Sequence, residues 1–255
     1  MPAPDSTEPA TADAARVEEL LRTADLTVCG QMPWSSNATL LCELWPAGSD
    51  APGRRDDQTP LGRAIYKPHR GEQPLWDFPD GLYRREIAAY DLAGSIGWDV
   101  VPPTVERDGP YGVGSLQWFV DADFDRHYFT LLEDEATHEQ LKRMCAFDFV
   151  ANSTDRKGGH VLVDENDHLW GIDNGLCLHA EFKLRTVIWD FAGERLAAAL
   201  ADDLARFVER PLPPALVAVL NPFERDAVKV RARALLADGR LPTDPTGRRY
   251  PWPLV

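Results

Sequence analysis

The chain has 255 residues, 44% of them apolar, which is enough for one large domain or for two lobes around a cleft. Its formal net charge of −14 argues against unaided binding to nucleic acid or to an anionic membrane, because both depend on Lys and Arg. No apolar run approaches the roughly 20 residues of a membrane span.

The beginning of the chain lacks the basic and apolar segments of a signal peptide, so we expect a cytoplasmic protein. The four cysteines show no CxxC spacing and lie among apolar neighbours, which predicts buried thiols in a reducing compartment rather than a zinc site. They are Cys29, Cys42, Cys145 and Cys177.

The first part of the chain is predicted to be mostly sheet. Residues 1–12, rich in Pro, Ala, Thr and acid, are expected to be disordered, and 14–24 have the apolar spacing of an amphipathic helix. A Gly- and Pro-rich surface loop is expected at 46–60 and a helix at 80–94. Strands are expected at 26–30, 38–45, 63–67, 100–106 and 113–120, the last two joined by a turn at Asp108-Gly109.

The second part is predicted to be mostly helical. Thr137-His-Glu-Gln140 is typical of a capping box that opens a helix running to about Val150. A short apolar hairpin follows, with strands at 161–163 and 169–172. Further helices are expected at 189–208 and 221–238, the latter capped by Asn221-Pro-Phe-Glu224, and the Pro-rich end should be extended.

This order indicates an α+β, bilobal protein-kinase-like fold. The β-rich N-lobe would span residues 13–120 and the helical C-lobe residues 121–240, the two forming a single kinase domain. Residues 241–255 would form an extended tail. Because one fold can serve many functions, the chemistry has to come from particular residues.

Two carboxylates, Asp155 and Asp173, lie on either side of the predicted hairpin. A tight hairpin brings its two ends together, so both acids can point into one pocket. Phosphoryl transfer needs that arrangement, with one carboxylate orienting a hydroxyl and the other holding Mg²⁺. The alternatives are an ordinary Asp- and Gly-rich turn at Asp155 and an Asx-turn at Asp173.

His160 lies five residues after Asp155, where a second metal ligand would be expected. Imidazole suits Mn²⁺ better than Mg²⁺, so His160 would ligate metal, contact a phosphate or brace the loop. Asp148, on the apolar face of its helix, is predicted to accept hydrogen bonds from the loop that carries Asp155, since a buried unpaired carboxylate is costly.

Lys67 ends a predicted strand, and Glu86 lies on the helix that follows. A lysine held by such a carboxylate can contact the α- and β-phosphates of a nucleotide; the alternative is a surface lysine and a solvated glutamate. The loop Ser35-Ser36-Asn37 between the first strands could contact phosphates through its backbone and side chains, although any hairpin loop could look similar. No GxGxxG or GxxxxGK[ST] pattern is present.

The segment from Asp155-Arg156 through His160 to Ile172-Asp-Asn-Gly175 resembles the phosphatidylinositol 3-/4-kinase-like superfamily, and its nearest well-known relative is the DRxxxN…IDNGL pattern of type II phosphatidylinositol 4-kinases. Within that superfamily it most resembles a compact actinobacterial family of atypical kinases. The resemblance extends from Cys29 to about Leu220 and is most specific in residues 148–178.

The resemblance implies that ATP lies between the lobes, with Lys67 at its phosphates, Glu86 paired with Lys67, and Ser35, Ser36 and Asn37 over the nucleotide. Asp155 would be the catalytic carboxylate and Asp173 the metal ligand. The hinge strand, whose backbone would contact adenine, consists of Gln117, Trp118, Phe119 and Val120. The family usually has Asn at the position of His160.

The function predicted from the sequence is therefore an ATP-dependent phosphotransferase using Mg²⁺ or Mn²⁺. It would transfer the γ-phosphate to an alcohol on an inositol-type or other small molecule or on a protein Ser/Thr. A basic, membrane-inserting segment of the kind that lipid kinases use is missing from the sequence. Two alternatives remain, namely an ATP-binding pseudokinase that acts as an interaction module and an enzyme that transfers AMP.

Overall fold

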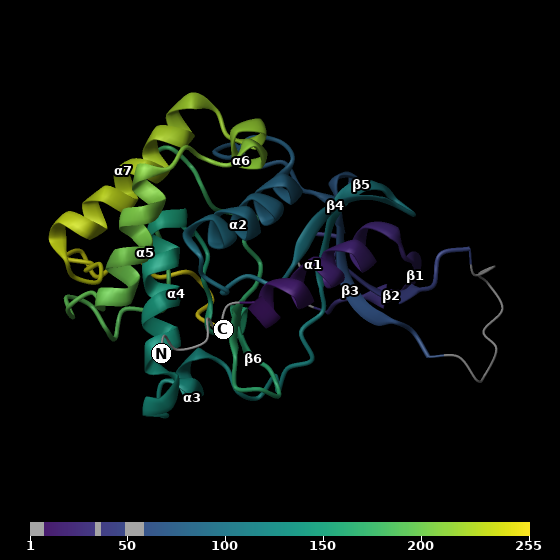
Figure 1. The fold of residues 1–255 in the computed structure, drawn as a ribbon, viewed down its shortest axis with the longest axis horizontal. Coiled ribbons are helices and arrows are strands. Elements are labelled where there is room, and N and C mark those ends of the chain that lie inside the picture. Colours follow the sequence, from purple (N-terminus) through teal and green to yellow (C-terminus); the bar gives the residue numbers. More distant parts are fainter. Residues whose placement is uncertain (1–7, 34–36, 49–58) are drawn as a thin grey trace, which may run out of the picture. The chain divides into compact units, whose positions relative to one another are not determined.

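The computed structural model describes residues 8–33, 37–48 and 59–255, and it contains two compact units (Figure 1). The first unit comprises residues up to 75 together with 103–119, and the second comprises 76–102 together with 120–255. Segment 76–102 belongs with the second unit because Ala88, Ala89 and Leu92 pack into the large core formed by the helices that follow. The lobe boundary at residue 120 stays a prediction.

The first unit is built on a five-stranded antiparallel sheet in the order β1-β2-β3-β5-β4. All five predicted strands are present. Their bounds are β1 Asp25–Gln31, β2 Leu40–Trp45, β3 Gly62–Pro68, β4 Thr104–Gly109 and β5 Gly112–Trp118. Part of the predicted loop at 46–60 lies outside the described residues.

The turn between β4 and β5 lies slightly later than predicted. Asp108 and Gly109 still belong to β4, where they pair with Val113 and Gly112. The connection is therefore Pro110-Tyr111, and Gly112 supplies the left-handed backbone with φ +95°. The Asp-Gly pair indicated the right hairpin but not the right loop residues.

Helix α1 (Glu8–Thr23) covers the sheet, and its Leu21 joins an apolar core with Cys42, Leu44 and Leu116. The predicted helix at 14–24 is confirmed, but it begins earlier, so the predicted disorder of residues 8–12 is wrong. Alanine and glutamate are strong helix formers, and several of them precede residue 14. Residues 1–7 lie outside the described part of the chain.

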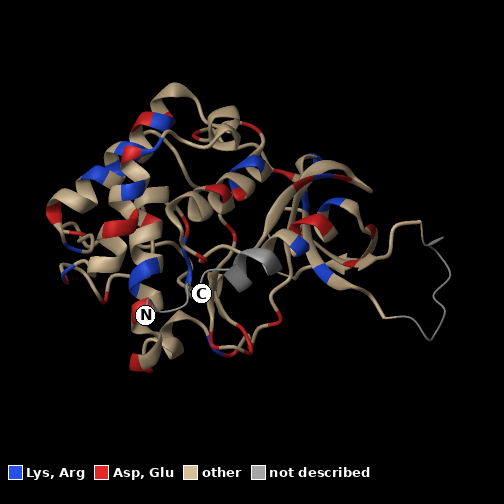
Figure 2. Ribbon diagram, in the orientation of Figure 1, with Lys and Arg blue, Asp and Glu red and all other residues tan. Residues whose placement is uncertain are grey.

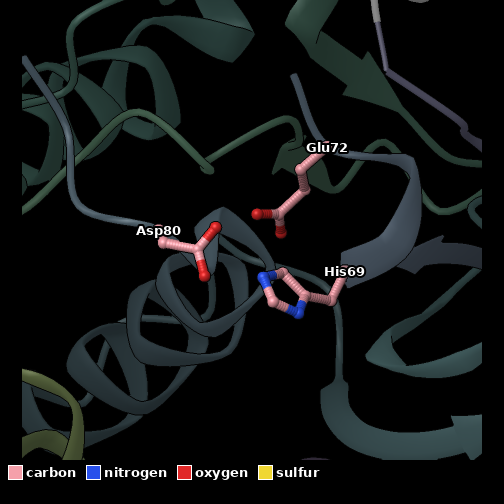
Figure 3. Close-up of side chains that lie close together, drawn as sticks. All are labelled: His69, Glu72 and Asp80. Carbon is pink, nitrogen blue, oxygen red and sulfur yellow. The ribbon is translucent and has the colours of Figure 1, made fainter. Parts of the chain in front are cut away.

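The short helix η1 (His69–Gly71) follows β3 directly, and the N–H of Glu72 donates to the carbonyl of His69 at 3.0 Å. Figure 3 shows the side chains of His69 and Glu72, which belong to the first unit. It also labels Asp80 of the second unit, which precedes helix α2 (Leu82–Ile96).

The second unit is a helical body around one large hydrophobic core. Helices α4 (His138–Ala151) and α5 (Ala198–Glu209) lie beside α7 (Pro222–Asp238), and α6 (Pro214–Val219) lies beside α2 (Figure 1). The predicted helices at 80–94, at 137–150 and at 221–238 are confirmed. The bounds of the remaining helices are α3 Tyr128–Leu131, η2 Glu135–Thr137 and η3 Gly158–His160.

Two local predictions in this unit are wrong. The hydroxyl of Thr137 donates to the carbonyls of Leu131 and Asp134, so it does not cap α4 and the predicted capping box does not form. Helix α5 begins at Ala198 instead of residue 189, because residues 190–193 form a turn in which Gly193 has φ +75° and Arg195 pairs with Arg240. The Asn221–Glu224 capping box of α7 is present as predicted.

The predicted hairpin is present as β6 (Val161–Val163) and β7 (Leu169–Gly171). The prediction that residues 241–255 are extended is wrong in part, because a turn at Asp244–Gly247 interrupts the segment, with Gly247 at φ +62°. The carbonyl of Leu254 accepts a hydrogen bond from the N–H of Gly158 at 2.7 Å. Among the described residues, no helix is both long enough and apolar enough to cross a membrane.

None of the four cysteines, all of which are described, forms a disulfide. Three are buried as predicted, and burial raises the pKa of the Cys42 and Cys177 thiols to about 12. The prediction is wrong for Cys29, which is exposed because the last three residues of β1 face solvent.

Candidate active site

The loop that carries Asp155 leaves helix α4 through Asn152, whose backbone is left-handed with φ 56°. This buried asparagine accepts a hydrogen bond from the N–H of Lys183 at 2.9 Å. Its amide donates to the carbonyls of His179 and Glu181 at 3.0 and 2.7 Å. One side chain therefore fixes the end of α4 to the segment that follows the metal-ligand candidate Asp173.

Arg156, next to Asp155, is fully buried and joins its own loop to α4 and to the segment that follows β7. Its Nε lies 3.1 Å from the Asp148 carboxylate, and its other nitrogens donate to the Ile172 carbonyl and the Asn174 side chain, both at 2.6 Å. The hydroxyl of Thr186 donates to Asp148 at 3.0 Å. The predicted bracing role of Asp148 is confirmed, and a paired buried carboxylate avoids the cost of isolation.

The carboxylate of Asp155 is partly buried, and its Oδ2 lies 3.1 Å from the Lys157 ammonium. Burial raises the pKa of Asp155 above its ordinary value, the hydrogen bond and charge of Lys157 act against that rise, and the charge of Asp173 adds to it. The charge of Asp173 thus acts on Asp155, and the shared pocket that the hairpin argument predicts stays a prediction. A carboxylate with a raised pKa is a better proton acceptor.

Asp173 follows β7 with a left-handed backbone at φ 57°, an uncommon conformation for a residue other than glycine. Such strain is concentrated at functional sites. Its side chain is 52% exposed, and its Oδ2 lies 3.5 Å from His160 Nε2. His160 Nδ1 in turn lies 3.0 Å from the carbonyl oxygen of Asp155, so this ring touches both acid-bearing segments.

Glu86 is buried on α2, and its carboxylate accepts a hydrogen bond from the N–H of Asn174 at 2.8 Å. The side chain of Asn174 bonds both Arg156 and the Gly171 carbonyl. Glu86 therefore holds the segment that carries Asp173. The pairing of Glu86 with Lys67 stays a prediction.

The remaining predicted nucleotide contacts belong mainly to the first unit. Lys67 lies near the end of β3, opposite Ser115, and the side chain of Asn37 accepts a hydrogen bond from the N–H of Gln73 at 2.9 Å. Ser35 and Ser36 lie outside the described residues. Of the predicted hinge, Gln117 and Trp118 end β5, and Phe119 and Val120 follow it.

Sequence reasoning missed the parts played by Asn152, Asn174, Thr186 and the side chain of Arg156. In the sequence, Asn152, Arg156 and Asn174 stand out only because they lie close to Asp155 or Asp173. Thr186 lies further along the chain and belongs to no motif. Asn174 gave the clearest signal, since it lies between Asp173 and Gly175 in the motif itself.

Comparison with solved structures defines the class of fold. The crystal structure of the Golgi casein kinase with Mn/ADP bound is similar at a TM-score of 0.56 and 13% identity, over 96% of this chain and 81% of that chain. The structure of hydra Fam20 with sugar is similar at a TM-score of 0.51 and 13% identity, over 93% of this chain and 91% of that chain. The protein has the kinase-like α+β fold that the sequence predicted.

Residues 103–197 match the family described as phosphatidylinositol 3- and 4-kinase. The protein Rv2133c of Mycobacterium tuberculosis is 38% identical over 92% of this chain and 94% of that protein. The chain belongs to the family of Rv2133c, a compact actinobacterial family of the phosphatidylinositol 3-/4-kinase-like superfamily. The resemblance noted in the sequence is confirmed.

Proposed function

We propose that the protein is an ATP-dependent phosphotransferase that moves the γ-phosphate to an alcohol. The observation that carries this proposal is the arrangement around the hairpin. Asp155 has a raised pKa, Asp173 has a strained backbone, and His160 contacts the segments of both. The kinase-like fold and the match of residues 103–197 support it.

In the transfer, the acceptor hydroxyl oxygen bonds to the γ-phosphorus while the bond from phosphorus to the β,γ-bridging oxygen breaks. ADP leaves with that bridging oxygen, and the hydroxyl proton passes to the carboxylate of Asp155. The raised pKa of Asp155 favours this proton transfer. The buried Arg156 keeps the loop fixed, so the carboxylate needs no reorganisation before it accepts the proton.

Asp173 and His160 would hold the divalent ion. A carboxylate oxygen fits either Mg²⁺ or Mn²⁺, and the imidazole favours Mn²⁺. When bound, the ion would neutralise charge on the phosphates. The Mn/ADP in the Golgi casein kinase structure supports ATP and a divalent ion as the cofactors here. The cytoplasmic location predicted from the sequence remains part of this proposal.

ATP itself would be held by Lys67, with Glu86 as its partner, and by Asn37 with the preceding Ser35 and Ser36. The segment Gln117, Trp118, Phe119 and Val120 would contact adenine. These assignments rest on the family resemblance.

The test is ATP turnover with Mg²⁺ or Mn²⁺ by the wild type, Asp155→Ala and Asp173→Ala. Both variants should lose phosphate transfer, whereas Asp202→Ala, an exposed change on α5, should retain it. Wild-type turnover in both acid variants would refute the proposal.

A nucleotide-binding pseudokinase is the second candidate, and the imidazole of His160 opposite Asp173 favours it. It predicts a thermal shift with ATP and no steady turnover. Phosphate transfer to any acceptor would exclude it. Transfer of AMP instead of phosphate would be recognised from the mass of the product.

A further inference from the structure

The second unit contains a cavity of about 830 Å³ on the side of the Asp155 loop that faces segment 179–185. This volume lies within the range of small-ligand sites. Aromatic residues of the segment before α2, notably Trp76 and Phe78, line part of it, and Phe182 lines another part. Thr154, the residue before Asp155, also lines the cavity, so a ligand within it lies next to the loop that carries the proposed proton acceptor.

Four of the lining residues are Lys or Arg and two are Asp or Glu, although the whole chain carries a net charge of −14. The basic residues are Lys183, Arg185, Arg248 and Arg249. Figure 2 shows that Lys or Arg residues occur together with Asp or Glu residues on other elements as well, such as α7. The cavity is thus a local concentration of positive charge in an acidic protein, and such a site attracts anions.

These cations come from two distant segments that the fold brings together. Asn152 fixes residues 179–183 through three hydrogen bonds, and the backbone of Arg185 bonds the carbonyl of Ser153 at 2.9 Å. From the other direction, the carbonyl of Arg249 accepts hydrogen bonds from the backbone of Thr186 and from Trp189 Nε1, both at 3.1 Å. Hydrogen bonds therefore fix the backbone of both segments that supply the basic residues of the cavity.

Two of the four cations form ion pairs with carboxylates of the protein, and the charge of a third, Arg185, acts on Asp155. Lys183 lies 2.8 Å from the Asp77 carboxylate, and Arg249 lies 3.5 Å from Asp244 and stacks over Phe182. Within the part of the chain that the structure describes, the guanidinium groups of Arg185 and Arg248 form no ion pair. Both side chains are exposed and line the cavity. They remain available to a ligand.

We propose that this cavity binds the acceptor alcohol and that Arg185 and Arg248 recognise a phosphate group which the acceptor already carries. Guanidinium groups bind phosphate oxygens through paired hydrogen bonds, and the aromatic walls can pack against the carbon skeleton. The acceptor is then a small phosphorylated alcohol whose free hydroxyl points towards Asp155. The acceptor role rests on the proposed phosphotransferase function. The binding of an anion in the cavity is independent of that function.

Binding without ATP tests the anion site independently of catalysis. The probes are inorganic phosphate, glucose 6-phosphate and glucose, titrated by calorimetry and by the fluorescence of Trp76, which is 96% exposed at the cavity. The same titration of Trp76→Phe shows how much of the fluorescence change comes from Trp76. Glucose 6-phosphate and phosphate should bind while glucose does not, and Arg185→Gln/Arg248→Gln should weaken binding by about tenfold or more. Arg233→Gln, an exposed change on α7, should leave it unchanged.

Vesicles of phosphatidylcholine with and without phosphatidylglycerol distinguish a lipid source of the phosphate ester from a soluble one. Loss of vesicle binding in the double variant, with no response to soluble phosphates, would assign the site to a lipid headgroup. The proposal would be overturned if an acidic serine peptide binds through Arg185 and Arg248 while the phosphates do not bind. It would also be overturned if wild type and double variant bind phosphate equally.

Phosphotransfer from ATP to glucose 6-phosphate then tests the acceptor role. Binding without transfer would leave the anion site in place and remove the acceptor role. Transfer that depends on Asp155 but not on Arg185 and Arg248 would keep the phosphotransferase and reject this cavity as its acceptor site.

Discussion

The two compact units differ in how their interiors are held together. The buried side chains of the first unit are apolar or neutral, such as Leu44, Leu116 and the Gln117–Thr104 hydrogen-bonded pair. Among the described residues, every buried charged side chain lies in the second unit. They are Arg85, Glu86, Asp148, Arg156, Glu224 and Arg231.

This difference indicates that the second unit depends more than the first on side chains held in exact positions. Apolar contacts are non-directional and tolerate small shifts, whereas a buried ion pair is stable only with its partners in place. Arg156 and Asp148 hold the Asp155 loop, and Arg85 bonds Glu224 at 2.5 Å between α2 and α7. The charged interior of the second unit thus fixes the segments that carry the candidate catalytic acids.

The largest effect is expected from Arg156→Met, which leaves the buried Asp148 carboxylate without its cation. Breaking one partner of a buried pair costs about 3–5 kcal/mol, so the free energy of unfolding should fall by that amount. Urea unfolding measures it, with the exposed Arg233→Met as the matched control. An unchanged unfolding midpoint would show that the buried network does not stabilise the second unit.

Gly114→Ala probes the first unit at its most crowded backbone contact. A Cβ on Gly114 would overlap the Lys67 carbonyl and lie 2.7 Å from Pro68 Cα. The strand end that carries Lys67 must move, and overpacking of this kind costs about 1–3 kcal/mol. If Lys67 contacts the nucleotide, KM for ATP should also rise.

The control is Gly94→Ala in α2, where nothing lies within 4 Å of the added methyl group. That change should stabilise the helix slightly, because alanine is the better helix former. Equal KM values for both alanine variants would argue against a nucleotide contact by Lys67.

Asn221→Ala should have a smaller effect, confined to the start of α7. The Asn221 side chain accepts from the N–H of Glu224 and Glu224 accepts from the N–H of Asn221, both at 3.0 Å. Loss of an N-cap costs about 1 kcal/mol. Thermal unfolding measures the change, and an unaltered midpoint would mean that the buried Arg85–Glu224 pair holds this end of α7 without the cap.

The smallest effect is expected from Asp244→Asn, and it depends on pH. Although burial acts to raise the pKa of Asp244, hydrogen bonds from Thr246 and from the backbone of Arg249 lower it from 3.8 to about 2. Stability from a depressed carboxyl pKa is present above the ordinary pKa and lost as pH falls through the folded value. Wild type and variant should therefore differ in Tm near neutral pH and converge between 3.8 and about 2. A difference that does not change with pH would contradict this.

The sequence predicted features that depend on neighbours along the chain, such as the β6–β7 hairpin and the α7 capping box. It predicted that Asp148 accepts hydrogen bonds from the Asp155 loop. It did not predict that Arg156, Asn174 and Thr186 complete the network, because those contacts join residues that no periodicity relates. Residues 189–197 were misassigned because a buried irregular segment can show the same apolar spacing as a helix. Thr137 was misassigned because its hydroxyl is used by Leu131.

The distribution of the thiols has a practical consequence. Cys29 is exposed in the first unit, whereas the other three cysteines are buried with raised pKa values and so remain protonated and shielded. A maleimide dye should therefore attach selectively at Cys29 in the folded protein. A second dye, on a cysteine introduced at the surface of the other unit, would then allow single-molecule energy transfer to compare the distance between the two units with and without ATP.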